Sequence, residues 1–174
     1  MAFDGTELER VAELPLWAQV LIAARMARRA ALATPNTVSE KTRTLFLAGC
    51  EAIELCAVTG QWRNSEKRTM RRAEEQSMPA QAYAASCVFH HAAAATHAAS
   101  DSLDFSAAET ACVNSVCNAL VSACEIEGTN PLQIRILVAA DLDLLRFACQ
   151  ENRISRYDPL GSAVLGRLPP AGAP

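Results

Sequence analysis

Apolar residues recur at helical spacing along most of the chain. In the segment that begins near Ser39, a stripe at three- and four-residue intervals falls on one face of a helix: Phe46, Cys50, Ile53 and Ala57. Strict two-residue alternation of polar and apolar positions, which is typical of strands, is absent over any useful length. The pattern predicts helices over residues 7–13, 15–33, 39–59, 64–77, 79–99, 107–127 and 131–152.

Residues that start and stop helices mark several of these boundaries. Pro15 fits the first turn of a helix, and Asn130 is a helix cap followed by a proline at the first helical position. Gly60 supplies a stop for the helix before it. Within that helix, Gly49 would let another helix approach closely. We therefore expect an all-α, single-domain bundle of about six helices, mostly antiparallel, with the first helix interrupted at Pro15.

The last two segments differ in their patterns. Residues 131–152 carry leucine and isoleucine on every face, which predicts a central helix buried nearly all round. Residues 153–174 contain three glycines and four prolines and therefore predict an extended tail. The apolar side chains that can pack this tail onto the bundle are Leu160, Val164, Leu165 and Leu168. We expect the domain to cover residues 1–168 and residues 169–174 to be flexible.

Composition and charge narrow the classes of partner. The chain has 174 residues, of which 51% are apolar, enough for the core of one domain. Alanine is abundant from Pro79 to Cys124, which predicts thin, closely packed helices. A net charge of -3 disfavours nucleic acid and membrane surfaces as partners. We find no signal-peptide pattern and no apolar run of about 18 residues, so we expect a cytoplasmic protein that does not enter the membrane.

The seven cysteines form no CxxC pair and lie in apolar helical segments. In a reducing compartment a buried thiol behaves as a small apolar group, so packing is the favoured interpretation. A reactive thiol would need a base or a positive neighbour that lowers its pKa, and the spacing favours none of the seven.

All three histidines and one cysteine share the predicted helix 79–99. On a helix, His90 and His97 are two turns apart, and Cys87 lies one turn before both His90 and His91. A structural zinc site needs four ligands, and a di-iron site needs Glu-x-x-His on two helices, and neither pattern occurs. We therefore expect packing and no cofactor. The alternative is a helical bundle that binds a metal or small cofactor through Cys87, His90, His91 and His97.

A basic stretch follows Gly60. On a helix its positive residues gather on one face, next to an aromatic residue: Trp62, Arg63, Lys67, Arg68, Arg71 and Arg72. This face could be merely solvated and balanced by Glu74 and Glu75, or it could bind an acidic protein or nucleic acid. Trp62 could stack on a partner or on a base. Among the specific hypotheses, an acidic protein partner is favoured over nucleic acid, because the net charge of -3 disfavours nucleic acid.

One acidic residue interrupts the apolar run of residues 131–152. Because an unpaired buried charge is costly, Asp141 should form an ion pair between helices, with Arg28 or with a histidine. Arg25, Arg28 and Arg29 form a second basic cluster, and their side chains are expected to lay their stems over the core and keep their charged ends in water.

Catalytic sequence motifs are missing. The chain has no glycine-rich phosphate loop, no Gly-x-Ser-x-Gly elbow and no His-Glu-x-x-His pattern. We therefore expect a protein without enzymatic activity that binds another protein.

A family resemblance agrees with this expectation. Alanine-rich helices at residues 80–99 and 107–124 precede a helix ending in Asp-Leu-Asp-Leu-Leu-Arg-Phe and the segment Tyr157-Asp-Pro-Leu-Gly. Over residues 15–160 this pattern resembles the alanine-rich helical immunity proteins of bacterial polymorphic toxin systems. The resemblance assigns no individual functional residue. It implies a partner that is a toxin or effector domain, neutralised by occlusion of its surface.

Overall fold

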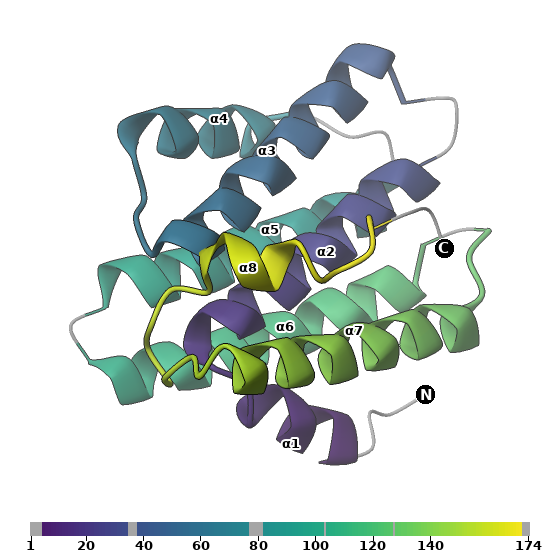
Figure 1. Ribbon diagram of the computed structural model, residues 1–174. Coiled ribbons are helices and arrows are strands. Elements are labelled where there is room, and N and C mark those ends of the chain that lie inside the picture. The colour runs from purple at the N-terminus through teal and green to yellow at the C-terminus, as the bar shows by residue number, and fades with distance from the viewer. Residues whose placement is uncertain (1–4, 35–37, 77–81, 103, 127, 172–174) are drawn as a thin grey trace.

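The computed structural model describes residues 5–34, 38–76, 82–102, 104–126 and 128–171, and within these ranges every regular element is a helix (Figure 1). The predicted all-α bundle is confirmed. The helices are α1 (Gly5–Ala12), α2 (Leu16–Ala33), α3 (Glu40–Thr59), α4 (Asn64–Glu74), α5 (Tyr83–Asp101), α6 (Phe105–Cys124), α7 (Pro131–Glu151) and α8 (Gly161–Leu165). None of the helices in this part of the chain is long and apolar enough to cross a membrane.

The predicted helix boundaries rest on side-chain and backbone caps. Ser39 Oγ accepts a hydrogen bond from the backbone N–H of Thr42 at 3.1 Å, which caps α3. Gly60 ends α3 in a left-handed conformation with a φ of 64°. Asn130 Oδ1 accepts a hydrogen bond from the N–H of Leu132 at 3.0 Å, at the start of α7. The expected starts and ends at residues 77, 79 and 127 lie outside the described residues.

The central helix is α2, and the prediction that the segment 131–152 is buried all round was wrong. Of the 18 residues of α2, 15 are buried, and the helix contacts α3, α5, α6 and α7. Its many alanines let these neighbours pack close on several sides. By contrast, α7 lies at the edge of the bundle and exposes Leu132, Ile136 and Phe147 (Figure 1).

Gly49 provides the close approach that the sequence predicted. A Cβ atom at this position would lie 2.6 Å from Cζ of Phe89 and 3.0 Å from Cβ of Ala73. The Phe89 ring is fully buried and packs edge-on against Phe46, with ring centroids 4.9 Å apart. The missing side chain therefore allows α3 to contact both α4 and α5.

The C-terminal segment differs from the expected extended tail. Gly161–Leu165 form the short helix α8, which contacts α3 and α7. Leu160, Val164 and Leu168 are buried because these apolar side chains cover the core beside α2 and α3. Ala171 is also buried, so this part of the expected flexible segment 169–174 packs against the domain. Residues 172–174 lie outside the described ranges.

The expected pairing of Asp141 with Arg28 was also wrong. Asp141 Oδ2 accepts hydrogen bonds from Arg25 Nε at 2.9 Å and from Arg29 Nη1 at 2.6 Å, and Arg25 Nη2 also donates to Asp141 Oδ1. Arg25 and Arg29 are one turn apart on α2 and face α7, so both are buried rather than extended into water. Arg28 points toward α3, where it donates two hydrogen bonds to Glu54.

The packing at Gly49 generates a test. Gly49→Ala should gain about 1 kcal/mol in helix propensity but lose more, about 1–3 kcal/mol, to overpacking against the buried Phe89 ring. We therefore expect the free energy of unfolding to fall by about 1 kcal/mol in urea denaturation. In a Phe89→Leu background, where the clashing ring is gone and the 3.0 Å contact with Cβ of Ala73 remains, the same substitution should cost less stability. A Gly49→Ala variant more stable than the parent would contradict this packing.

The buried ion pair generates a second test. Burial alone would raise the pKa of Asp141, but hydrogen bonds from Arg25 and Arg29 outweigh it and hold the pKa below its ordinary value. The charged form therefore stabilises the fold above about pH 4, and this contribution disappears as the pH falls through the lowered pKa. Asp141→Asn should lower the free energy of unfolding by about 3–5 kcal/mol at pH 7, because it leaves two buried guanidinium groups without a carboxylate. The difference in the free energy of unfolding between Asp141→Asn and the parent should become smaller as the pH falls.

Asp143→Asn is the matched control for this test. The Asp143 side chain is 69% exposed and pairs with Arg10 at the surface. Asp143→Asn should lower the free energy of unfolding by less than about 1 kcal/mol. Equal losses for both variants in urea denaturation at pH 7 would show that the buried network contributes no more than a surface pair.

Candidate protein-binding surface

The basic stretch predicted from sequence forms one face of α4. Three residues spaced along the opposite side of the helix are buried against the bundle: Glu66, Met70 and Ala73. This burial orients α4, which contacts α3 and α5 and lies at the edge of the molecule away from α7 (Figure 1). The side chains of Lys67, Arg68, Arg71 and Arg72 are all exposed as a result. These four residues are called the cation face below.

The cation face has no carboxylate partners among the described residues. Other arginines of the described chain pair with aspartate or glutamate: Arg10, Arg25, Arg28, Arg29, Arg146, Arg156 and Arg167. The four side chains of the cation face form no such pair within the described ranges. Positive charge on α4 is therefore left for solvent or for a partner.

Three acidic residues lie in this stretch, and two of them are directed away from the cation face. Glu66 is buried, and its Oε2 accepts a hydrogen bond from the backbone N–H of Arg63 at 2.7 Å, which closes the first turn of α4. Glu74 lies toward α5, with Oε1 3.9 Å from His90 Nδ1. Glu75 is exposed one turn beyond Arg71. The position of Glu66, three residues into a helix, is the sequence signal for a capping rather than a balancing role.

Trp62 anchors the start of α4. Its half-buried ring stacks on His97 of α5, with centroids 4.9 Å apart and an interplanar angle of 20°. Lys67 Nζ lies 5.9 Å from the centroid of the same ring. The indole Nε1 is buried without an acceptor among the described residues. One face of the ring is therefore already occupied by His97 and is closed to a partner's side chain or base.

The histidines of α5 have separate environments. His97 Nδ1 lies 3.2 Å from Asp101 Oδ2 on the same helix, whereas His90 lies beside Glu74 of α4. Burial, together with the neighbouring charge of His90, lowers the pKa of His91. Cys87 is half-buried, and in the described chain Asp141 pairs with Arg25 and Arg29 rather than with a histidine. Within the described ranges no three His, Cys, Asp or Glu side chains are grouped so that they could hold a metal ion.

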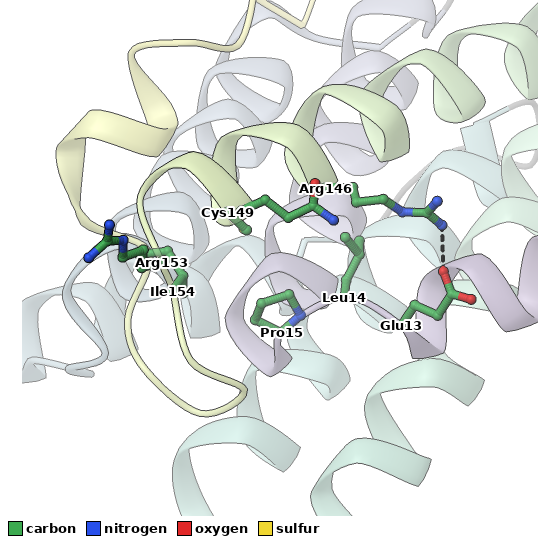
Figure 2. A pocket seen from close by; sticks show the side chains of 8 residues that line it. Glu13, Leu14, Pro15, Arg146, Cys149, Arg153 and Ile154 are labelled. Carbon is green, nitrogen blue, oxygen red and sulfur yellow. Dashed lines mark hydrogen bonds and ion pairs between the residues drawn. The ribbon is translucent and has the colours of Figure 1, made fainter.

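A surface pocket of about 200 Å³ lies where the α1–α2 junction meets the end of α7 (Figure 2). Glu13 and Arg146 form an ion pair of 2.5 Å at its edge. Cys149 also lines the pocket but is only 4% exposed, and burial raises its pKa to about 11. The thiol is therefore protonated at neutral pH and is a poor nucleophile. No histidine is among the residues that line this pocket.

Three further cysteines are buried in the bundle. Burial raises the pKa of Cys56 to about 11 and that of Cys112 to about 12. Burial also raises the pKa of Cys50 far above its ordinary value. These positions agree with the packing interpretation of the sequence.

The environment of Trp62 generates a test. Trp62→Ala removes the ring that packs against His97, and because the ring is half-buried we expect a loss of about 2 kcal/mol in the free energy of unfolding. Trp62→Phe keeps an aromatic ring and removes the buried Nε1–H that lacks an acceptor, so its cost should be below about 1 kcal/mol. Urea denaturation measures both. Equal losses for the two variants would contradict an anchoring role for the stacked ring.

Comparison with known proteins adds no family to this description. No family model, no curated protein and no solved structure matches the chain.

Proposed function

We propose that this protein has no enzymatic activity and acts by binding an acidic surface of another protein through the cation face of α4. The observation that carries this proposal is the set of four exposed cations without carboxylate partners in the described chain. Their mutual repulsion on neighbouring turns destabilises the free helix slightly. An acidic partner would relieve that repulsion and gain complementary charge contacts, which increase both specificity and association rate.

A protein partner fits this surface better than nucleic acid does. The chain carries a net charge of -3, so positions away from α4 repel a long polyanion. With 11 residues, α4 is only about 16 Å long and spans few phosphates of a duplex. One face of the Trp62 ring already stacks on His97 and is closed to a base. A compact cluster of carboxylates on a protein surface matches both the size and the sign of this face.

The resemblance to immunity proteins gives the partner a class. If this chain acts as those immunity proteins do, the partner is a toxin or effector domain, and binding neutralises it by covering the surface through which it acts. The buried, protonated thiol of Cys149 is a poor nucleophile for the pocket that it lines. Such a role requires only a stable, complementary surface.

Charge reversal on α4 tests the proposed surface. The candidate partner is the protein encoded by the gene next to that of this chain. The double variant Arg68→Glu/Arg72→Glu should weaken binding to this protein by at least about tenfold and reduce the dependence of the affinity on salt. Isothermal titration calorimetry at two salt concentrations measures both effects. The control Arg153→Glu/Arg167→Glu makes the same change in net charge away from α4 and should bind as the parent does.

Two results would contradict the proposal in different ways. If the α4 variant kept the parent's affinity and salt dependence, the cation face would be excluded as the binding surface. If co-expression of the parent failed to restore growth to cells expressing the adjacent protein as a toxin, the immunity role would be excluded. Circular dichroism of each variant would establish that the fold is retained.

A further inference from the structure

A second surface pocket, of about 290 Å³, lies between α2, α3 and the segment that follows α8. The carbonyl of Pro169 in this segment accepts a hydrogen bond from Arg25 Nη2 of α2 at 2.9 Å, which ties the segment to the bundle (Figure 1). The pocket is lined by two arginines and a glutamate and by mainly apolar residues of the C-terminal segment: Arg25, Arg28, Glu54, Leu165, Leu168, Pro169, Pro170 and Ala171. Its volume is at the lower end of the range of about 300–1,000 Å³ that ligand sites occupy, so it suits a small molecule. It is called the α8 pocket below.

The arginine cluster at the α8 pocket carries one positive charge more than its carboxylate balances. Arg25 and Arg29 share the single carboxylate of Asp141, and all three side chains are buried. A buried charge without a counter-charge is costly, because it has lost hydration without gaining an ionic partner. The cluster therefore favours the presence of one further negative charge.

The other acidic side chains near the pocket do not supply this charge. Glu54 already accepts two hydrogen bonds from Arg28, at 2.9 and 2.8 Å, so these two residues balance each other. Glu51 lies 3.9 Å from Arg28 Nη2, but its side chain is 69% exposed and its charge is screened by water. The excess positive charge therefore remains on Arg25 and Arg29.

One nitrogen of Arg25 is open to the α8 pocket. Arg25 Nε and Nη2 donate to Asp141 and to the carbonyl of Pro169, whereas Nη1 has no acceptor among the described residues. The buried polar side-chain atoms that lack a partner in the described chain are Gln19 Oε1 and Trp62 Nε1. Arg25 Nη1 is not one of them, so this nitrogen is unpartnered but not sealed inside the core. Because Arg25 lines the pocket, Nη1 can donate to a ligand there.

We propose that the α8 pocket binds a small monocarboxylate, whose carboxylate accepts hydrogen bonds from Arg25 Nη1 and whose apolar part packs on Leu165 and Leu168. Hydrogen bonds between a guanidinium and a carboxylate are assisted by charge and are stronger than neutral ones. A single negative charge matches the excess of one positive charge in the cluster. A dianion such as a phosphate monoester exceeds it and is repelled by Glu54. This site is separate from the cation face of α4 and does not depend on the function proposed for that face.

Isothermal titration calorimetry of the full chain with sodium benzoate tests the class of ligand. Benzamide has nearly the same shape without the charge, and phenylphosphonate carries a second negative charge. We expect a Kd of about 1 mM or lower for benzoate and at least about tenfold weaker binding of benzamide. Absence of benzoate binding, or equal affinity for benzamide, would overturn the proposal. Tighter binding of phenylphosphonate than of benzoate would overturn the assignment to a monocarboxylate.

A matched pair of variants tests the location of the site. Leu165 is half-buried and lines the pocket, so Leu165→Glu places a carboxylate there that competes with benzoate, whereas Leu165→Gln adds a similar shape without charge. Benzoate binding should weaken at least about tenfold in the Glu variant and less than about threefold in the Gln variant. Arg68→Glu/Arg72→Glu removes positive charge from the cation face and should bind benzoate as the parent does. Thermal denaturation monitors the folding of each variant.

Two outcomes of these variants would place the benzoate site elsewhere and overturn the proposal. One is equal affinity of the Leu165→Glu and Leu165→Gln chains for benzoate. The other is loss of benzoate binding in the α4 variant, which would show that benzoate binds the exposed cations rather than the buried cluster.

Discussion

The fold depends on the burial of one carboxylate between two arginines. Asp141 of α7 accepts hydrogen bonds from Arg25 and Arg29 of α2, and Arg25 Nη2 also donates to the backbone carbonyl of Pro169 at 2.9 Å. Three segments that are distant in sequence therefore meet at one charged cluster. The inner side of α7 is apolar apart from Asp141, whereas polar residues lie among the apolar ones on its outer side. The contact of Asp141 with the two arginines fixes the same side inward, and the row from Leu132 to Phe147 faces outward as a consequence.

Small residues set the positions of the remaining helices. The alanines of α2 and Gly49 of α3 allow backbones to approach closely, so aliphatic side chains and few aromatic rings suffice to fill the core. The same packing places α4 on the outside of α3, held by Met70 and Ala73 and by the stack of Trp62 on His97. The cation face of α4 and the exposed apolar residues of α7 therefore lie on different parts of the surface.

Local sequence signals predicted the helices and their ends, whereas contacts between helices were harder to predict. Ser39, Gly60 and Asn130 act within a few residues of themselves, so their roles can be read from neighbouring positions. The central helix was misassigned because α7 is rich in leucine and isoleucine, while the alanines of α2 reveal their burial only when neighbouring helices are in place. Arg28 differs from Arg25 and Arg29 by rotation around α2, and only the position of α3 and α7 determines which arginine meets Asp141. The exposure of the cation face was predictable from the helical spacing of α4, but the stacking of Trp62 on a histidine 35 positions away was not.

The charged cluster also constrains the order of folding during synthesis. Arg25 is separated by 116 residues from Asp141 and by 144 residues from Pro169. When α2 leaves the ribosome, its two arginines have no buried partner, so their charged ends remain hydrated and oppose full burial of that helix. The central helix of the bundle is thus made early but reaches its final environment late, after α7 and the segment beyond α8 have emerged. Until then α5 and α6 emerge beside an α2 whose two arginines still lack the carboxylate of Asp141.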